Sequence, residues 1–266
     1  MKKVMLCLLP CLLLWGGIAF SQDRPQPDPE NARIVVSDIQ NFWRAYDQST
    51  EASCAEAMQR EYLDRGSIGL KDFVRLRISS ASNLASRINR APGYYASIRE
   101  STLRVESLEP RIRAAFHGLK NVYPKAVFPT VYFVIGLLST GGTVSDRGLL
   151  IGAEMYAKTG TTPLSELSAW QSAVIRPVDD IPAIVAHELV HYQQKLGTGG
   201  TVLAECLREG SADFVAELIS GKNINEHLKA YGVGYKITQA FYERAGQESR
   251  DRRHSEYPRL QEVPGR

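Results

Sequence analysis

The chain has 266 residues, of which 44% are hydrophobic and 23% are charged. These fractions are typical of a folded globular protein, and they exclude a disordered chain, a collagen and a membrane protein with several spans. The 32 Lys and Arg residues exceed the 29 Asp and Glu residues by only three. So small an excess argues against nucleic acid as a partner, because phosphate binding needs a concentrated basic face.

Residues 1–21 have the organisation of a secretory signal peptide. Two lysines precede an uncharged run from Val4 to Phe20, and small residues stand at Ala19 and Ser21. The run is short for a membrane span and contains Pro and Gly residues. We therefore expect cleavage before Gln22 and an exported protein, periplasmic or secreted, that keeps no stable membrane span. An uncleaved or lipid anchor is the alternative.

Cleavage would leave Cys54 and Cys206 as the cysteines of the mature chain. Two cysteines do not make a disulfide framework, although an oxidising compartment permits a bridge between them. The apolar helical context of Cys206 favours a buried free thiol.

The remaining chain is predicted to form a Pro-rich linker (22–33), one domain (34–248) and a flexible tail (249–266). Apolar residues recur every three or four positions from Ile34 to Tyr123, which predicts helices. Pro110 should bend or restart one of them. The pattern changes at Pro124, so the domain has a helical part (34–123) and a second part (124–248).

The second part begins with two predicted strands. Residues 127–135 are β-branched and aromatic, and residues 148–154 form another apolar run. A Gly-rich turn at 139–146 separates them, so we expect the second strand to run antiparallel to the first. If it is the edge of the sheet, an extended peptide could pair with it. The fold class is therefore α+β and mainly helical.

A helix after these strands carries the main motif. Asp179 or Asp180 can cap it, Pro182 suits its first turn, and Gly197 should end it. The face of this helix that lies opposite the motif should pack on the core. It consists of Val185, Ala186, Leu189, Val190 and Leu196.

The motif is His187-Glu188-Leu-Val-His191, an HExxH sequence. Helical spacing places both imidazoles one turn apart on one face, where they can bind a single Zn²⁺ ion. Glu188 lies beside them, close enough to act as a general base on a metal-activated water.

A second helix is predicted from Thr201 to Ser220, with a stripe of carboxylates opposite its apolar residues Leu203, Leu207, Phe214, Val215 and Leu218. A catalytic zinc site needs a third protein ligand, and this stripe can supply it. Glu209 and Glu205 lie one turn apart, so helical phase alone leaves both open. Asp213 could accept a hydrogen bond from a ligand histidine and fix its tautomer.

The sequences VAHELVHYQQ and EGSADF together resemble the gluzincin metallopeptidases. More narrowly, they are similar to predicted Zn-dependent proteases that are distantly related to gliding-motility lipoproteins. The resemblance covers about residues 125–220 and implies a zincin-like fold. It also implies His187, His191 and Glu209 as zinc ligands and Glu188 as the base. Gluzincins often carry an electrophilic Tyr or His in a long C-terminal lobe, whereas this chain is short after Glu209.

These features predict an exported zinc metallopeptidase that hydrolyses peptide or protein substrates. Candidates for a donor to the oxyanion are His227, Tyr231 and Tyr235. The alternative is a non-catalytic zincin-fold envelope protein that acts in assembly or binding. A structural zinc protein fits less well, because such sites favour closed, Cys-rich coordination.

Overall fold

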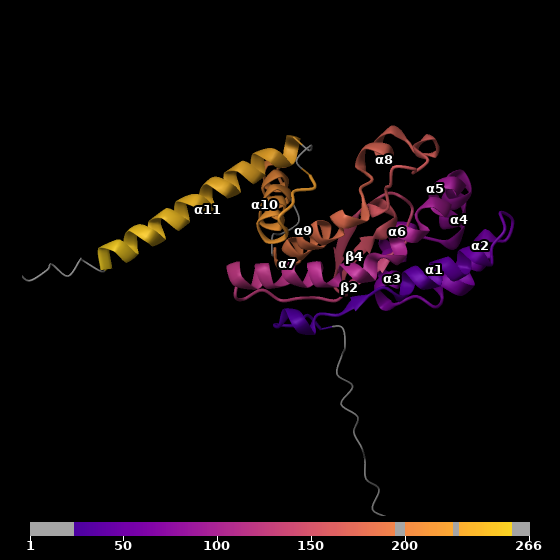
Figure 1. Ribbon diagram of the computed structural model, residues 1–266, viewed down its shortest axis with the longest axis horizontal. Coiled ribbons are helices and arrows are strands. Elements are labelled where there is room, and N and C mark those ends of the chain that lie inside the picture. The colour runs from indigo at the N-terminus through magenta and orange to yellow at the C-terminus, as the bar shows by residue number, and fades with distance from the viewer. Residues whose placement is uncertain (1–23, 195–199, 226–228, 257–266) are drawn as a thin grey trace, which may run out of the picture.

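The computed structural model describes residues 24–194, 200–225 and 229–256, so the predicted signal peptide lies outside the described residues. Helices make up most of this part of the chain and surround one small sheet (Figure 1), which agrees with the predicted α+β class. No helix among the described residues combines the length and apolar character needed to cross a membrane.

The strands β2, β3 and β4 come between two groups of helices along the chain, α1 to α7 before them and α8 to α11 after them. The α-helices are α1 (Ser37–Asp47), α2 (Cys54–Ala57), α3 (Ile68–Phe73), α4 (Ala81–Arg90), α5 (Pro92–Ser97), α6 (Arg99–Leu103), α7 (Glu109–Val122), α8 (Ala169–Val174), α9 (Ile181–Gln193), α10 (Val202–Ser220) and α11 (Lys229–Glu256). Short 3-10 or π segments are η1 (Pro29–Asn31), η2 (Met58–Leu63), η3 (Val74–Ile78), η4 (Val105–Leu108), η5 (Ala153–Tyr156), η6 (Leu164–Glu166) and η7 (Val178–Asp180). The strands are β1 (Ile34–Val35), β2 (Val131–Val134), β3 (Gly142–Ser145) and β4 (Gly148–Gly152).

The sheet has the strand order β1-β2-β4-β3. β2 and β4 are the two predicted strands, but they run parallel, so the antiparallel prediction is wrong. Both strands are buried along their whole length. A strand buried on both faces has no polar alternation, and its sequence therefore carries no sign of its direction.

The segment 139–146, predicted as a turn, contains the strand β3. β3 forms an antiparallel hairpin with β4 and occupies the edge of the sheet, so β4 is not the edge strand to which a peptide could pair. Gly148 begins β4 at φ +144°, and a Cβ there would lie 2.1 Å from the Thr130 carbonyl oxygen. Only glycine can hold this close approach, so Gly148 allows the tight return of the hairpin.

The beginning of the predicted helical part is a strand. Ile34 and Val35 form β1 and pair in parallel with Val131 and Tyr132 of β2. The helical prediction for these two residues is wrong because β-branched neighbours fit a sheet, and the first helix starts only at Ser37.

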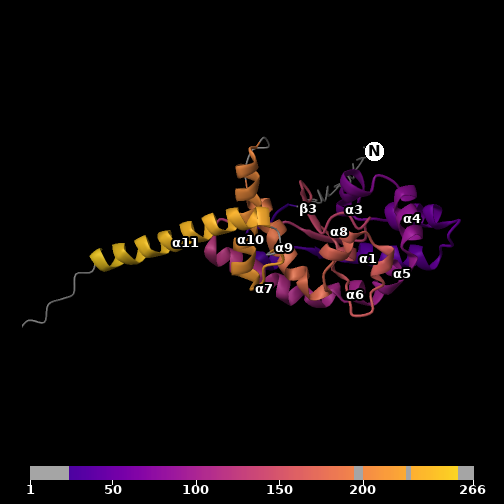
Figure 2. The same cartoon turned by 90° about the horizontal axis from the view of Figure 1, so that it is seen from above.

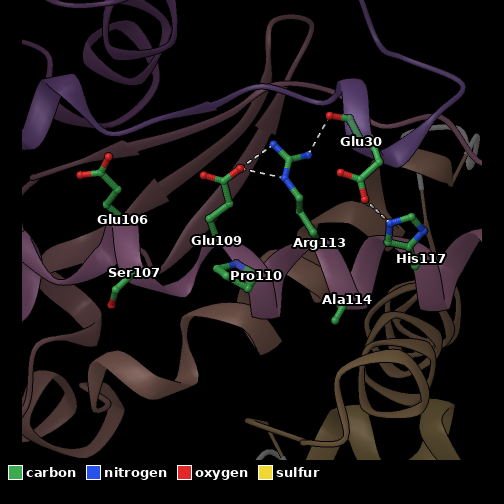
Figure 3. A pocket seen from close by; sticks show the side chains of 8 residues that line it. All are labelled: Glu30, Glu106, Ser107, Glu109, Pro110, Arg113, Ala114 and His117. Carbon is green, nitrogen blue, oxygen red and sulfur yellow. Dashed lines mark hydrogen bonds and ion pairs between the residues drawn. The ribbon is translucent and has the colours of Figure 1, made fainter.

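The predicted linker packs against the domain instead of leading freely into it. Gln26 pairs with Phe128, and Pro29 and Ala32 are buried. Figure 3 shows Arg113 of α7 directed at this segment, where it donates hydrogen bonds to the carbonyl oxygens of Pro29, Glu30 and Ala32. Because the guanidinium group bonds to these backbone carbonyls, it holds the segment against α7. The described part of the segment therefore belongs to the domain.

The first helices support the end of β2 through buried tyrosines. The Tyr62 hydroxyl donates to the carbonyl of Ile135 and accepts from its amide, each at 2.8 Å, and the Tyr95 hydroxyl donates to the Gly136 carbonyl. Gly69 of α3 lies so close to the Tyr132 ring that a Cβ would come within 2.1 Å of it. α3 therefore packs directly on the sheet, and one core joins the two parts of the chain.

Glu154 holds the loop that leads from β2 to the edge strand. Its side chain is fully buried, and its Oε1 accepts from the amide of Leu138, which has a φ of +58°. Burial raises the pKa of Glu154 to about 7, against the opposing effect of its backbone hydrogen bonds. A carboxyl group with a raised pKa is more easily protonated. Burying its neutral form at this turn costs less free energy than burying a charged carboxylate.

The last helix, α11, runs beside α10 and then projects away from the body of the molecule (Figures 1 and 2). It continues to Glu256, so the residues 249–256 of the predicted tail are helical, and the remainder lies outside the described residues. Pro110 lies in the first turn of α7, where the predicted restart occurs. Cys54 is buried, Cys206 is partly buried, and both are free thiols.

Candidate metal centre

α9 begins and ends close to the predicted positions. Asp180 is its N-cap residue and Pro182 lies in its first turn, although the Asp180 side chain makes no capping hydrogen bond. The helix ends at Gln193, before Gly197, which lies outside the described residues with Leu196. His187, Glu188 and His191 therefore occupy the second half of the helix.

The helix is enclosed along most of its length, so its burial extends beyond the face that was predicted to pack on the core. Every residue from Ile181 to Val190 is buried, because α7, α10, β3 and β4 all pack around it. His187 keeps 4% and Glu188 keeps 7% of its surface exposed. The polar side chains of the motif thus lie in the interior, where desolvation strengthens electrostatic interactions.

α10 extends from Val202 to Ser220, and Thr201 caps it through a 3.2 Å bond from the amide of Ala204. Its predicted apolar face is only partly buried, since Leu203 and Leu218 are exposed. Its buried positions are the small residues Gly210, Ala212 and Ala216, together with Asp213 and Phe214. Small residues allow α10 to approach α9 closely, and its carboxylates therefore reach the imidazoles.

Three predicted ligand atoms converge between the two helices. His191 Nε2 lies 2.9 Å from His187 Nε2 and 3.2 Å from Glu209 Oε2. His187 Nε2 lies 3.5 Å from Glu209 Oε2. Tetrahedral zinc with bonds of about 2.0–2.1 Å separates its ligand atoms by roughly 3.3 Å. The two imidazoles and the carboxylate therefore match the spacing and the donor chemistry of a catalytic zinc site with one open position.

Glu205 does not take part in this group. Its side chain is 55% exposed and pairs with Arg208 at 2.8 Å. Glu209 is only 14% exposed, and its second oxygen, Oε1, lies 2.6 Å from Arg208. The geometry thus separates two glutamates that helical phase left equivalent.

A polar group lies beside the non-coordinating nitrogen of each histidine, in an ion-pair contact for His187 and a hydrogen bond for His191. His187 Nδ1 lies 2.8 Å from Asp213 Oδ1, and Asn225 donates to the same oxygen at 2.8 Å. His191 Nδ1 lies 2.7 Å from Gln194 Oε1. Sequence reasoning proposed Asp213 for this position but missed Gln194, whose only signal is its place three residues after His191. Partners on Nδ1 fix the ring orientation and direct each Nε2 at the centre.

Burial and charge set the protonation states of the site. Burial alone would lower the pKa of His187, but the contacts with Asp213 and Glu209 outweigh it and raise that pKa to about 10. Burial also acts to raise the pKa of Glu209, yet hydrogen bonds from both histidines hold it well below its usual range. The pKa of Glu188 is raised by burial, with partial compensation from the two histidines. A carboxyl with a raised pKa is suited to accept a proton and return it.

A cavity of about 370 Å³ opens beside His187, Glu188 and Glu209. β3 borders it, and a Cβ on Gly142 would come within 2.5 Å of Glu188 Oε1. Tyr156 also lines it, and among the described residues its hydroxyl has no hydrogen-bond partner. No local pattern marks this tyrosine, because a 3-10 turn after β4 brings it to the site.

The predicted oxyanion donors do not reach this cavity in the described part of the chain. The Tyr235 hydroxyl donates to Glu217 Oε2 at 2.8 Å. His227 and the side chain of Tyr231 lie outside the described residues. Tyr156 is therefore the tyrosine that the structure places beside Glu188.

The family model described as gliding motility protein GldB matches residues 22–240, and the chain therefore belongs to that family. The match includes the N-terminal helices, which carry none of the motifs that suggested the resemblance. No curated protein and no solved structure gives a significant match. The expected relationship to gliding-motility proteins is confirmed, whereas the metallopeptidase resemblance stays a prediction.

Proposed function

We propose that this member of the GldB family is an exported zinc metallopeptidase with a zincin-like site. The convergence of His187, His191 and Glu209 on one point, with Glu188 in the same cavity, carries the proposal. Export is supported by the signal-like leader and by the family, whose model is that of a lipoprotein. Peptide or protein substrates are supported by the edge strand that borders the cavity, since an extended chain can pair with β3.

His187, His191 and Glu209 would hold the zinc ion. When bound, zinc supplies a Lewis acid that polarises a scissile carbonyl and lowers the pKa of water. Glu188 accepts the proton of the attacking water and passes it to the departing amine. Asp213 and Gln194 keep the two imidazoles in the tautomer that directs Nε2 at the centre.

Tyr156 is suited to donate a hydrogen bond to the oxyanion, because its hydroxyl shares the cavity with Glu188 and lacks another partner among the described residues. We expect Tyr156→Phe to lower kcat roughly 100-fold with little change in KM, as for the loss of one oxyanion donor. Steady-state kinetics on a peptide substrate would measure this. Tyr123→Phe, at an exposed tyrosine outside the cavity, is the control. Equal kcat for the two variants would remove Tyr156 from the mechanism.

A second candidate function is a non-catalytic role in envelope assembly or binding. The family match favours it, since the family is described by gliding motility and not by hydrolysis. Against it stands the burial of Glu188, because keeping a carboxyl group at 7% exposure beside an open cavity costs free energy. A binding protein would have no use for a base at that position.

Metal analysis of the purified mature protein separates the two functions. We expect about one zinc ion per chain, as a His₂Glu donor set with one open position implies. We also expect digestion of a peptide library that stops on chelation and returns with added zinc. Stoichiometric zinc without any digestion would favour the binding role. Protein that holds no zinc even after incubation with the metal would contradict both the centre and the proposed chemistry.

A further inference from the structure

Two cavities flank Glu188, and their linings differ in chemistry. Both are about 370 Å³, and they share Gly142, His187, Glu188 and Glu209. The first, here the mixed cavity, adds the apolar side chains of Met155, Trp170, Val174, Ile184 and Ile224, and also Arg176, whose guanidinium donates to the Ile224 carbonyl at 2.6 Å. The second, here the basic cavity, adds Arg77, Thr143, Val144, His191 and Arg208. A substrate that crosses Glu188 therefore meets a partly apolar lining on one side, where the arginine is bonded to a backbone carbonyl, and a mainly polar lining with two arginines on the other.

The two arginines of the basic cavity differ in how their charges are balanced. Arg208 lies 2.8 Å from Glu205 and 2.6 Å from Glu209. Arg77 instead donates from Nη2 to the Thr143 hydroxyl at 2.9 Å, and no carboxylate of the described residues lies within ion-pair distance of it. Its neighbour Arg75 pairs with Asp72 at 3.6 Å. Arg77 is thus a cation held against the edge strand without a fixed anionic partner.

Arg77 lies in the same cavity as the site. It lines the basic cavity together with His187, Glu188 and His191. A guanidinium group held there would attract an anionic group of a substrate, because the surrounding low dielectric strengthens such an interaction.

The direction of β3 relates the two cavities to a bound peptide. The mixed cavity lies along 139–142 and the basic cavity along 142–144. An extended chain pairing antiparallel with β3, the more stable arrangement, would place its amino-terminal side at Thr143 and Val144. Resting on the proposed peptidase function, we propose that Arg77 selects substrates with an acidic side chain on the amino-terminal side of the scissile bond.

Peptide binding to the Glu188→Gln protein tests the selection without turnover. The probes are fluorescent peptide pairs that carry Glu or Gln amino-terminal to one large apolar residue and are otherwise identical. We expect the Glu peptides to bind roughly 10 to 100 times more tightly, as for a charge-assisted hydrogen bond. Adding Arg77→Gln should abolish the difference, and Arg77→Glu should reverse it in favour of Lys peptides. Arg75→Gln, on the same short helix, is the matched control and should leave the preference intact.

Equal affinity for the Glu and Gln peptides, including no binding of either, would overturn the selection. An equal effect of Arg75→Gln and Arg77→Gln would overturn it as well. Hydrolysis by the wild-type protein, measured in parallel, separates this failure from that of the proposed function. Hydrolysis without acidic preference would contradict only the role of Arg77, whereas preference in binding without hydrolysis would contradict only the peptidase.

Discussion

Glu188→Gln should keep stoichiometric zinc and lose roughly 10² to 10⁴-fold in peptide hydrolysis, the usual effect of removing a general base. The amide preserves the shape of the side chain but cannot accept the proton of the attacking water. Glu188 is not one of the three converging ligand groups, so metal binding should be unaffected. Metal content and initial rates on the same preparation measure the two quantities.

The fold should tolerate this change. Glu188 is buried, and burial raises its pKa, so a neutral amide relieves a desolvation cost instead of adding one. Thermal unfolding of both proteins would verify this. The exposed Glu205→Gln provides the control for a charge removed near the site. Unchanged hydrolysis in Glu188→Gln would contradict the assignment of Glu188 as the base. The digestion would then require a different explanation.

The site could be predicted from the sequence where it depends on local spacing. One turn of helix separates His187 from His191, and one turn separates Glu209 from Asp213, so the order of these groups along each helix is already determined. Helical spacing could not choose between Glu205 and Glu209. That choice depends on how closely two helices approach, which Gly210, Ala212 and Ala216 decide together with α9.

The sheet was less predictable, because its pairing depends on contacts between distant segments. β2 and β4 read correctly as strands, but their parallel direction results from β3 taking the edge of the sheet. β3 itself was hidden, since its sequence, Gly142 to Ser145, has the composition of a turn. Arg77 and Tyr156 reach the site from separate segments for the same reason, so no local pattern marks them.

Asp213, which contacts the non-coordinating nitrogen of His187, should affect zinc affinity less than the ligands do. Asp213→Asn keeps the side chain beside His187 but removes its negative charge, and Asn225 already donates to the same oxygen. We expect zinc affinity to fall about 10 to 100-fold, the usual range for groups that orient a ligand. Titration against a chromophoric chelator would measure the affinity. The loss found for Asp213→Asn is the reference with which the loss in a ligand variant is compared.

Glu209→Gln should weaken zinc binding more than Asp213→Asn, because it removes the anionic oxygen from a site with only three protein donors. Glu205→Gln should leave the affinity unchanged, since Glu205 is exposed and contacts Arg208 instead of the histidines. The two glutamates lie one turn apart on α10 and share Arg208 as a partner, so their variants are matched in charge and surroundings. The same chelator titration compares them directly. If Glu205→Gln released zinc while Glu209→Gln retained it, the ligand would be assigned one turn too late. If neither change altered zinc binding, the carboxylate would not complete the centre, and the proposed peptidase would lose its third ligand.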